Sequence, residues 1–433
     1  MQAFQRMPLR QLRIDLVLVS ILINLWHLRI ALAMSKKPRY IFLTYEQYSS
    51  PYVETYFLHL FSKIGYEVDI YQLCPNSPSQ VITEMYQHFE NVNWYVVPMN
   101  GSTKAGKFLR SLYLLRKNIL GSHRKANYLI VRSIAGGLFG CCLWLTGVRF
   151  RKYVYDSDGL AIDERIEFKA WRKLSLTTAF ARISEFLSMR FSDGIVVRST
   201  NTISTLQKRY RFTQHKKFAV LINGRPREIF IKSDSDQQAS YRLKFGIKQN
   251  SFVLLYVGSI GPQYLFEEIA AIFHAVKGVA QSTELVIATI SDNQTVFKVL
   301  PKSLTNDEEN VHVLHLAPTE IIEVVSISNV GICLRANSDS MKHVAPLKLR
   351  EYLISGLPVI YTDNTGDNFS LPNSFAHAYD LSSENRINSL VTWWEQEVMV
   401  NNLKNRVEAQ EFALQNLEIS IDSELLSRFL KTI

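Results

Sequence analysis

The chain has 433 residues, of which 47% are hydrophobic and 20% charged, so it is long enough for two domains with full cores and extensive disorder is not expected. The net charge is +10. The cysteines have neither paired spacing nor nearby histidines, which argues against a zinc site and a disulfide framework and favours a reducing cytosol: Cys74, Cys141, Cys142 and Cys333.

Residues 1–37 form an apolar and basic N-terminal segment. Leu16–Trp26 is strongly apolar but too short to cross a membrane, which takes about 20 apolar residues. Three alternatives stay open: an interfacial helix, a weak signal anchor, or an extension ahead of a translation start at Met34. Secretion is the least favoured outcome, because neither a typical cleavage site nor a disulfide pattern follows.

From Tyr40 the pattern alternates between strands and helices. Tyr40–Thr44 predicts a strand, the segment near Val53–Ile64 a helix, and Glu67–Tyr71 a second strand. Further short strands are predicted at Trp94–Val97, Tyr128–Val131, Tyr153–Tyr155 and Phe191–Val197. Strands that alternate with helices indicate a parallel sheet, and we assign residues 38–215 to an N-terminal Rossmann-like domain.

One interval of this domain is entirely free of acidic residues, from Glu90 to Asp156. It alternates apolar residues with basic ones at Lys104, Lys107, Arg110, Arg116, Lys117, Arg124, Lys125, Arg132, Arg149, Arg151 and Lys152. This pattern predicts a basic amphipathic surface that contacts an anionic membrane. Nucleic acid is the less favoured partner, since no zinc-finger, RNA-recognition or helix-turn-helix signature is present. The remaining alternative is a solvated basic helix.

A second series of strands follows the boundary predicted near residues 210–217. The predicted strands are Phe218–Ile222, Phe252–Val257, Glu284–Ala288, Val311–Leu314, Val330–Cys333 and Pro358–Tyr361. We assign residues 216–400 to a C-terminal Rossmann-like domain and residues 401–433 to helices that can pack back on the first domain. The expected fold is therefore α/β, with two facing parallel sheets and a ligand site in the cleft beyond their strand ends.

The segment 346–360 predicts a short helix followed by a buried strand. Pro346 suits the first helical turn, Gly356 suits the left-handed position after the helix, and Pro358 prevents its continuation. Leu349 and Leu353 share one face and are expected to pack inward.

A neighbouring face of the same helix carries Lys348 and Glu351. The first turn holds a lysine and no acidic residue, so the positive end of the helix dipole would favour phosphate oxygens. The alternative is a solvated ion pair between Lys348 and Glu351 that contributes roughly 0.2–0.5 kcal/mol.

Two other turns follow predicted strands at the same edge. Gly258 and Ser259 follow Phe252–Val257, and a glycine there permits close approach of the backbone to a phosphate. Asn223 and Gly224 follow Phe218–Ile222. Taken alone, each is also compatible with an ordinary turn between a strand and a helix.

In this order the motifs resemble the C-terminal half of GT-B glycosyltransferases, specifically the large retaining group, family 4-like, used in bacterial polysaccharide and lipopolysaccharide assembly. The resemblance implies that the NG turn and the glycine turn approach the donor, that a helix glutamate binds the nucleotide ribose, and that a lysine lies near the diphosphate. It assigns a donor site to Asn223, Gly224, Arg225, Gly258, Ser259, His343, Lys348 and Glu351.

The sequence departs from the family pattern at two places. A glutamate common in the family is replaced by His343, which we predict to be a surface histidine unless it faces the cleft. The glycine turn lacks the usual basic residues and continues with Gln263, Tyr264 and Leu265. The phosphate charge would then be met by Lys348, Arg225, Arg335 or Lys342.

The segment Asp156–Arg165 is similar to an acidic loop in the acceptor domain of some of these enzymes. A carboxylate there can orient or deprotonate an acceptor hydroxyl, and Asp156 is our first candidate with Asp158 second. The alternative is an Asx-type turn with Asp163 capping a helix.

The resemblance implies transfer of a sugar from a nucleotide diphosphate sugar to a glycan or lipid-linked acceptor, without a metal, with Asp156, Asp158 and Lys348 as the catalytic candidates. We expect a cytoplasmic protein in peripheral contact with the inner face of the membrane. Two alternatives are a sugar-nucleotide epimerase or hydrolase of the same fold, and a non-catalytic member that binds nucleotide or a partner.

Overall fold

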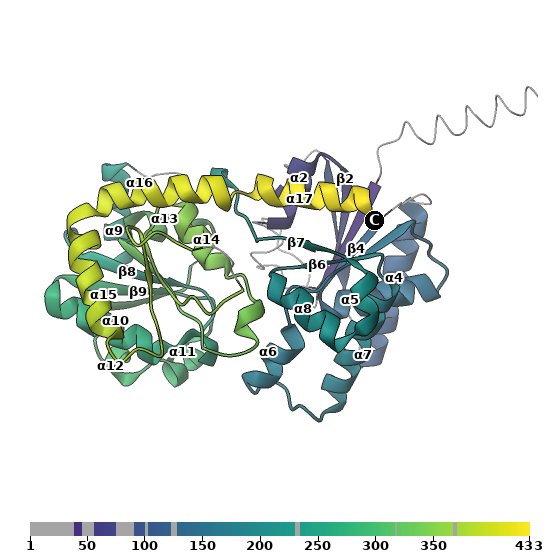
Figure 1. The fold of residues 1–433 in the computed structure, drawn as a ribbon, viewed down its shortest axis with the longest axis horizontal. Coiled ribbons are helices and arrows are strands. Elements are labelled where there is room, and N and C mark those ends of the chain that lie inside the picture. The colour runs from purple at the N-terminus through teal and green to yellow at the C-terminus, as the bar shows by residue number, and fades with distance from the viewer. Residues whose placement is uncertain are drawn as a thin grey trace, which may run out of the picture.

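The computed structural model describes residues 39–45, 56–74, 91–99, 103–122, 128–229, 234–316, 318–366 and 370–433. Two α/β domains lie side by side (Figure 1). The predicted N-terminal segment, residues 1–37, lies outside the described residues. Within the part of the chain that is described, no helix is long and apolar enough to cross a membrane.

The first sheet has the strand order β3-β2-β1-β4-β5-β6-β7 and is parallel throughout. Both of its faces are covered, which is why the central strand β1 (Arg39–Tyr45) is an almost continuous apolar run. The other strands are β2 (Glu67–Cys74), β3 (Val92–Pro98), β4 (Tyr128–Arg132), β5 (Lys152–Asp156), β6 (Gly194–Val197) and β7 (Lys217–Val220).

Strand β7 differs from the sequence prediction, which placed Phe218–Ile222 at the start of the second domain. It pairs with β6 from Gly194 and Lys217 to Val197 and Val220, so it is the edge strand of the first sheet. The chain leaves this sheet only after β7, downstream of the predicted boundary. An apolar run predicts a strand, but it does not specify the neighbour with which that strand pairs.

Helices cover the two faces of the first sheet as separate groups. Helices α2 (Leu58–Ile64) and α17 (Ile419–Thr432) share a core with one face. The opposite face packs on α4 (Lys104–Ser122), α5 (Ser133–Leu145), α7 (Leu176–Phe191) and α8 (Thr200–Arg209). The short helices α6 (Ala161–Glu167) and η3 (Arg211–His215) complete the domain.

The second sheet is also parallel and has the order β10-β9-β8-β11-β12-β13. Its strands are β8 (Phe252–Val257), β9 (Thr283–Ala288), β10 (Val311–Leu314), β11 (Val330–Cys333), β12 (Val359–Tyr361) and β13 (Ala376–Ala378). Two parallel-sheet domains confirm the predicted α/β architecture.

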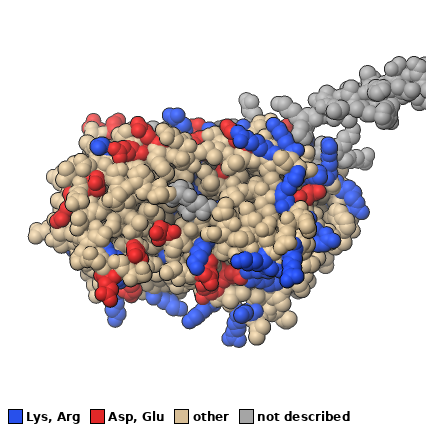
Figure 2. Space-filling model, viewed as in Figure 1, with Lys and Arg blue, Asp and Glu red and all other residues tan. Residues whose placement is uncertain are grey.

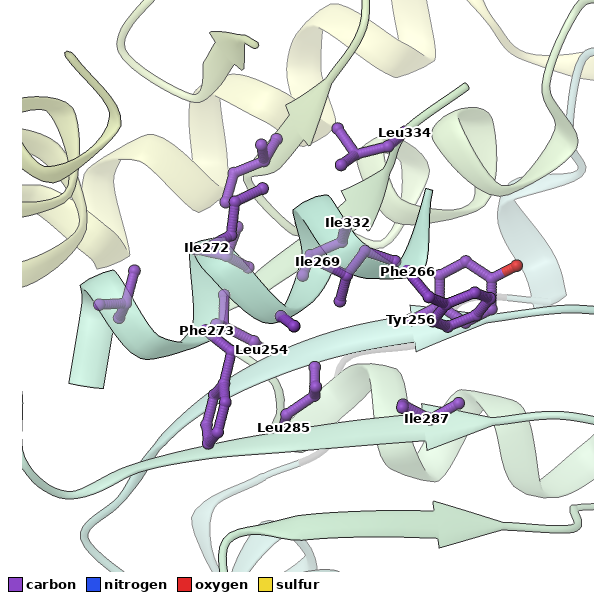
Figure 3. Packing of buried hydrophobic residues seen from close by; sticks show 14 of the residues in the cluster. Leu254, Tyr256, Phe266, Ile269, Ile272, Phe273, Leu285, Ile287, Ile332 and Leu334 are labelled. Carbon is purple, nitrogen blue, oxygen red and sulfur yellow. The ribbon is translucent and has the colours of Figure 1, made fainter. Parts of the chain in front are cut away.

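Apolar side chains of the helices fix both faces of this second sheet. On one face, Phe266, Ile269 and Phe273 of α10 (Phe266–Val279) meet side chains of β8 and β9 (Figure 3). That layer also contains α11 (Asn293–Val299), α12 (Lys302–Thr305) and α15 (Arg386–Trp393). The other face packs on α9 (Ser235–Phe245), α13 (Pro318–Ile327), α14 (Leu347–Ile354) and α16 (Met399–Asn416).

The end of the chain returns to the first domain. Helix α16 lies on the second domain and α17 on the first, where it packs on α2 and β7 (Figure 1). At this crossing the backbone of Arg225 pairs with Leu417 and Ile419. The Asp422 carboxylate accepts hydrogen bonds from the backbone N–H groups of Ile222 and Gly224 at 2.7 and 2.8 Å. The two crossings of the chain are therefore bonded to one another.

Candidate active site

A cavity of about 480 Å³ lies between the domains and is lined by residues of both. Its C-terminal wall is built where β8 and β9 end, at Val257 and Ala288, and where α14 begins. Its N-terminal wall contains Asp158, Glu164 and Arg198. This is the position expected for a ligand site in open parallel sheets.

Helix α14 forms as its sequence predicts. Gly356 has a φ of 68° just beyond the helix, and a Cβ there would lie 2.6 Å from the Arg406 carbonyl oxygen. Leu349 and Leu353 are buried in the core of the second domain, as predicted. The packed face and the glycine end fix the helix, so its first turn is held against the cavity.

Lys348, in that first turn, is buried and faces the cavity. Its Nζ lies 3.8 Å from the ring centroid of Tyr256 and 4.6 Å from that of Tyr264, and it has no hydrogen-bond partner among the described residues. Burial, and then the charge of Arg335, hold the pKa of this amine well below its ordinary value. The alternative of a solvated pair with Glu351 is therefore wrong.

Gly258 is required by its backbone and by its neighbour. Its φ of 135° is one that other residues rarely adopt, and a Cβ would lie 3.0 Å from the Nζ of Lys348. The next residue, Ser259, lines the cavity, and its carbonyl oxygen accepts a hydrogen bond from Tyr256 at 2.5 Å. The glycine turn and the lysine therefore meet at one point.

Arg335 lines the same wall just after β11, and its guanidinium lies 4.5 Å from the ring centroid of Tyr264. No carboxylate among the described residues lies within ion-pairing distance of Arg335. Tyr264, which departs from the family pattern, therefore supplies a ring surface to two cations. Sequence reasoning missed this role, although the ring at position 264 follows the glycine turn directly.

Glu351 lines the cavity and is held from behind by Arg225. The Arg225 Nη2 donates to Glu351 Oε1 at 2.8 Å, and the arginine side chain is fully buried. Arg225 does not line the cavity, so the structure places it behind the predicted donor residues rather than among them. Lys342 also lies outside the cavity, where it is exposed and paired with Asp339 at 2.8 Å.

The two residues of the NG turn separate in the structure. Asn223 adopts a φ of 58°, lines the cavity and donates through Nδ2 to the Ala345 carbonyl oxygen at 3.1 Å. Gly224 instead packs on the chain crossing, because a Cβ there would lie 2.9 Å from the Glu418 carbonyl oxygen. Only Asn223 contributes a side chain to the cavity.

On the N-terminal wall, the second candidate carboxylate, Asp158, lines the cavity and the first, Asp156, does not. Asp156 is buried, accepts hydrogen bonds from Arg198 at 2.7 Å and Arg132 at 3.4 Å, and does not line the cavity. Its Oδ1 accepts from the backbone N–H of Asp158, which is the Asx-type turn that the alternative predicted. Asp158 lines the cavity, pairs with Arg132 and lies 3.5 Å from Nε of Arg198.

Asp163 does not cap α6, since no side chain caps that helix. Its carboxylate binds Arg182 and Arg209 instead, which lowers its pKa against the opposing effect of burial. The next residue, Glu164, lines the cavity and was missed, although it lies within the acidic segment that the sequence singled out. Burial raises the pKa of this carboxyl, opposed by Arg335.

His343 faces the cleft, which is the exception that the prediction of a surface histidine allowed. It is buried, lines the cavity, and its Nδ1 lies 3.4 Å from the Thr202 hydroxyl of the other domain. Contact between the domains covers it, a burial that neighbours along the sequence do not reveal. That burial lowers the pKa of the imidazole, so the ring is mostly neutral near neutral pH.

No family model and no curated protein matches the sequence. Solved structures do match. Sucrose-phosphate synthase from Thermosynechococcus elongatus has a TM-score of 0.66 at 14% identity over 91% of this chain and 99% of that one. HepE from Anabaena in complex with UDP-glucose has a TM-score of 0.68 at 12% identity over 91% and 100%.

WaaG, a glycosyltransferase involved in lipopolysaccharide biosynthesis, matches with a TM-score of 0.63 at 16% identity over 90% of this chain and 98% of that chain. These similarities cover 90–91% of this chain and so extend over both domains. The chain therefore has the GT-B fold of these glycosyltransferases.

Proposed function

We propose that the protein transfers a sugar from a nucleotide diphosphate sugar to an acceptor hydroxyl. The observation that carries the proposal is the pair of cations Lys348 and Arg335, which face the cavity beside the glycine turn without a carboxylate partner among the described residues. A diphosphate would supply the missing negative charge. The structural similarity to HepE, solved with UDP and with UDP-glucose, supports this choice of ligand.

The donor would be bound by positive charges and by side chains that the fold already orients in the free protein. Lys348 and the N-terminus of α14 would bind the diphosphate and stabilise the charge that develops on it as the sugar leaves. Glu351, oriented by Arg225, would accept hydrogen bonds from the ribose hydroxyls. We propose that these groups suffice without a metal ion, so activity is expected to persist in the presence of EDTA.

The acceptor hydroxyl would approach from the N-terminal wall. Asp158 is the candidate to orient it, because it is the predicted carboxylate that lines the cavity. Glu164 lines the same wall, where burial raises the pKa of its carboxyl and so favours the protonated form more than in water. Positioning of the acceptor against the donor would supply much of the rate enhancement.

Calorimetry with UDP, GDP and ADP tests the donor site. We expect one of these nucleotides to bind, and the absence of binding by all three would contradict the proposal. Incubation of the matching nucleotide sugars with and without lipid extracts then tests the reaction. A transferase releases nucleotide efficiently only when an acceptor is present, whereas the alternative epimerase or hydrolase consumes donor alone.

We propose that the acceptor is lipid-linked, or a glycan held at the cytoplasmic face of the membrane, as cell-surface polysaccharide or lipopolysaccharide synthesis requires. Support comes from α4, whose exposed face carries basic residues together with Leu109 and Tyr113, each 63% exposed. The basic residues exposed on this helix are Lys104, Lys107, Arg110, Arg116 and Lys117. A bilayer of anionic lipids attracts such a surface.

Charge reversal tests this contact. The variant Lys104→Glu, Lys107→Glu, Arg110→Glu should sediment at least tenfold more weakly with vesicles that contain phosphatidylglycerol, because each basic residue near such a surface contributes about 1 kcal/mol. The matched control reverses three exposed lysines of the other domain, Lys298, Lys302 and Lys404, and should still sediment. Equal binding of both variants would remove α4 from the contact.

A further inference from the structure

The outer face of α7 carries a row of exposed apolar side chains. Leu176, Phe180 and Ile183 are 92%, 58% and 55% exposed, and their spacing places them on one side of the helix. Phe191 continues the row and stacks on Trp144 at the end of α5, with 5.2 Å between the ring centroids. Single exposed apolar residues are ordinary, but a contiguous row indicates a surface that another body covers.

The loop that precedes α7 extends this row. Leu174 is 98% exposed, although it stands before the N-cap Ser175, where an apolar residue often packs on the helix. The residue on which it would pack is Ala179, which is itself exposed. Leu174 therefore contributes little to the core and is exposed where the loop leads into α7.

Basic side chains surround the apolar row. The acidic residue of α7, Glu185, is buried and bound by Arg182 at 3.1 Å and by the Tyr210 hydroxyl at 2.6 Å, so it adds no exposed negative charge. The exposed basic residues beside the row, three of them in the loop itself, are Lys169, Arg172, Lys173, Arg149 and Arg190.

The exposed basic residues around the apolar row distinguish between two possible partners, a second copy of the chain and an anionic bilayer. A second copy of the chain, docked through the same face, would bring two sets of arginines and lysines together, and like charges facing one another oppose such an interface. An anionic bilayer meets both features, since its headgroups attract the basic residues and its acyl region accepts the leucines.

The apolar row on α7 is connected to the cavity wall through the loop 168–175 and α6. Helix α6 carries Glu164 in the cavity wall and runs directly into the loop 168–175. At the end of α6, Glu167 accepts hydrogen bonds from the backbone N–H groups of Asp339 and Ser340 at 3.2 and 3.0 Å, which joins this helix to the opposite domain. The loop lies between α6 and α7 at the lower edge of the molecule in Figure 1.

The α4 surface belongs to the same side of the first domain. Helix α5 packs against both α4 and α7, so the basic face of α4 and the apolar row of α7 belong to one layer of helices. Blue side chains gather over this domain in Figure 2, whereas the other domain shows more red. The sequence singled out α4 through its missing acidic residues but gave no sign of the row on α7.

We propose that Leu174 and Leu176 insert into the headgroup boundary of an anionic bilayer, with the lysines and arginines of the loop bound to lipid phosphates. Insertion at this loop would bring α6, which carries Glu164 of the cavity wall, close to the lipid surface. This inference rests on the proposed function in one respect, that it names the surface on which a lipid-linked acceptor is held. Binding to lipid itself does not depend on catalysis.

A test at high salt distinguishes insertion of the leucine side chains from electrostatic attraction between the basic residues and the lipid headgroups. Ionic strength near 0.5 M screens the exposed lysines and arginines, while burial of leucine side chains persists. We expect the wild-type chain to retain measurable sedimentation with phosphatidylglycerol vesicles at this salt, and the variant Leu174→Ser, Leu176→Ser to bind about tenfold more weakly or worse. The matched control Val400→Ser, Leu403→Ser removes two similarly exposed apolar residues from α16 and should bind as wild type.

A tryptophan at the loop gives a second measurement. In Leu174→Trp, brominated lipids should quench fluorescence beyond the level seen with wild type, because the new ring enters the bilayer. The inference is overturned if the double serine variant binds as wild type, if high salt removes all wild-type binding, or if light scattering shows a wild-type dimer that the variant loses. Nucleotide calorimetry on the same samples measures the donor site independently of lipid binding. A failure of the proposed lipid insertion can therefore be distinguished from a failure of the proposed nucleotide binding.

Discussion

On the C-terminal wall of the cavity, Lys348 and Arg335 face the cavity without a carboxylate partner among the described residues, whereas on the N-terminal wall Arg198 is bonded to Asp156 at 2.7 Å. The first arrangement keeps two charges available for an anion at the cost of burying them. The second neutralises its charges within the fold and so fixes the position of the carboxylate that faces the cavity. The cations of the C-terminal wall thus have no carboxylate partner among the described residues, whereas those of the N-terminal wall do.

The largest expected effect comes from removing the charge of the donor wall with Lys348→Met. Nucleotide affinity should fall about 100-fold, since loss of a buried charged contact costs roughly 2–5 kcal/mol. The unfolding temperature of the free protein should rise, because an apolar side chain replaces a buried amine without a partner. Calorimetry and thermal denaturation measure the two quantities.

The exposed Lys342→Met is the matched control for this change and should alter neither quantity, since that lysine lies outside the cavity. Unchanged nucleotide affinity in Lys348→Met would remove that lysine from the donor site. A fall in the unfolding temperature of Lys348→Met would instead mean that the amine stabilises the free protein. The two walls would then not differ in whether their buried cations stabilise the fold.

The acceptor wall should respond in the opposite way. Asp156→Asn leaves two buried arginines short of negative charge and should lower the free energy of unfolding by about 3 kcal/mol. Asp158→Asn, whose side chain is 28% exposed, should cost less than about 1 kcal/mol and yet reduce transfer at least tenfold. Urea denaturation and initial rates distinguish the two; a stable, inactive Asp156→Asn would instead make Asp156 the reacting carboxylate.

A smaller effect is expected in the pH dependence of nucleotide binding. Burial and Arg335 lower the pKa of Lys348 in the free protein, and a bound diphosphate would raise it again. Between the two pKa values, binding takes up a proton, so affinity should fall as pH rises, by at most about tenfold per pH unit. Calorimetry in two buffers of different ionisation enthalpy should detect the proton, and Lys348→Met should bind without this uptake.

Much of the fold and of the C-terminal wall of the cavity could be predicted from the sequence because the relevant signals are local. Strand and helix periods gave two Rossmann-like domains, and Gly356 and the leucines of α14 lie as their spacing indicates. The glycine at position 258 meets Lys348 because both follow strands at the same sheet edge. Local chemistry and topology together were sufficient for these residues.

The misplaced residues depend on contacts between segments far apart in the chain. His343 is covered by Thr202 of the other domain, and Arg225 is placed behind Glu351 because the chain crosses between domains there. Asp156 and Asp158 are two residues apart, and their ranking depended on where two distant arginines lie. Spacing along the sequence does not contain this information.

The bonded crossing of the chain has a mechanical consequence. The backbone near Arg225 and the backbone near Glu418 form a short parallel bridge, and the Asp422 carboxylate fastens α17 to the residues just before it. Because both chain segments pass between the domains at this point, a rotation of one domain against the other would strain these bonds. Arg225 takes part in this bridge and also holds Glu351 in the cavity wall, so the same rotation would strain the Arg225–Glu351 contact.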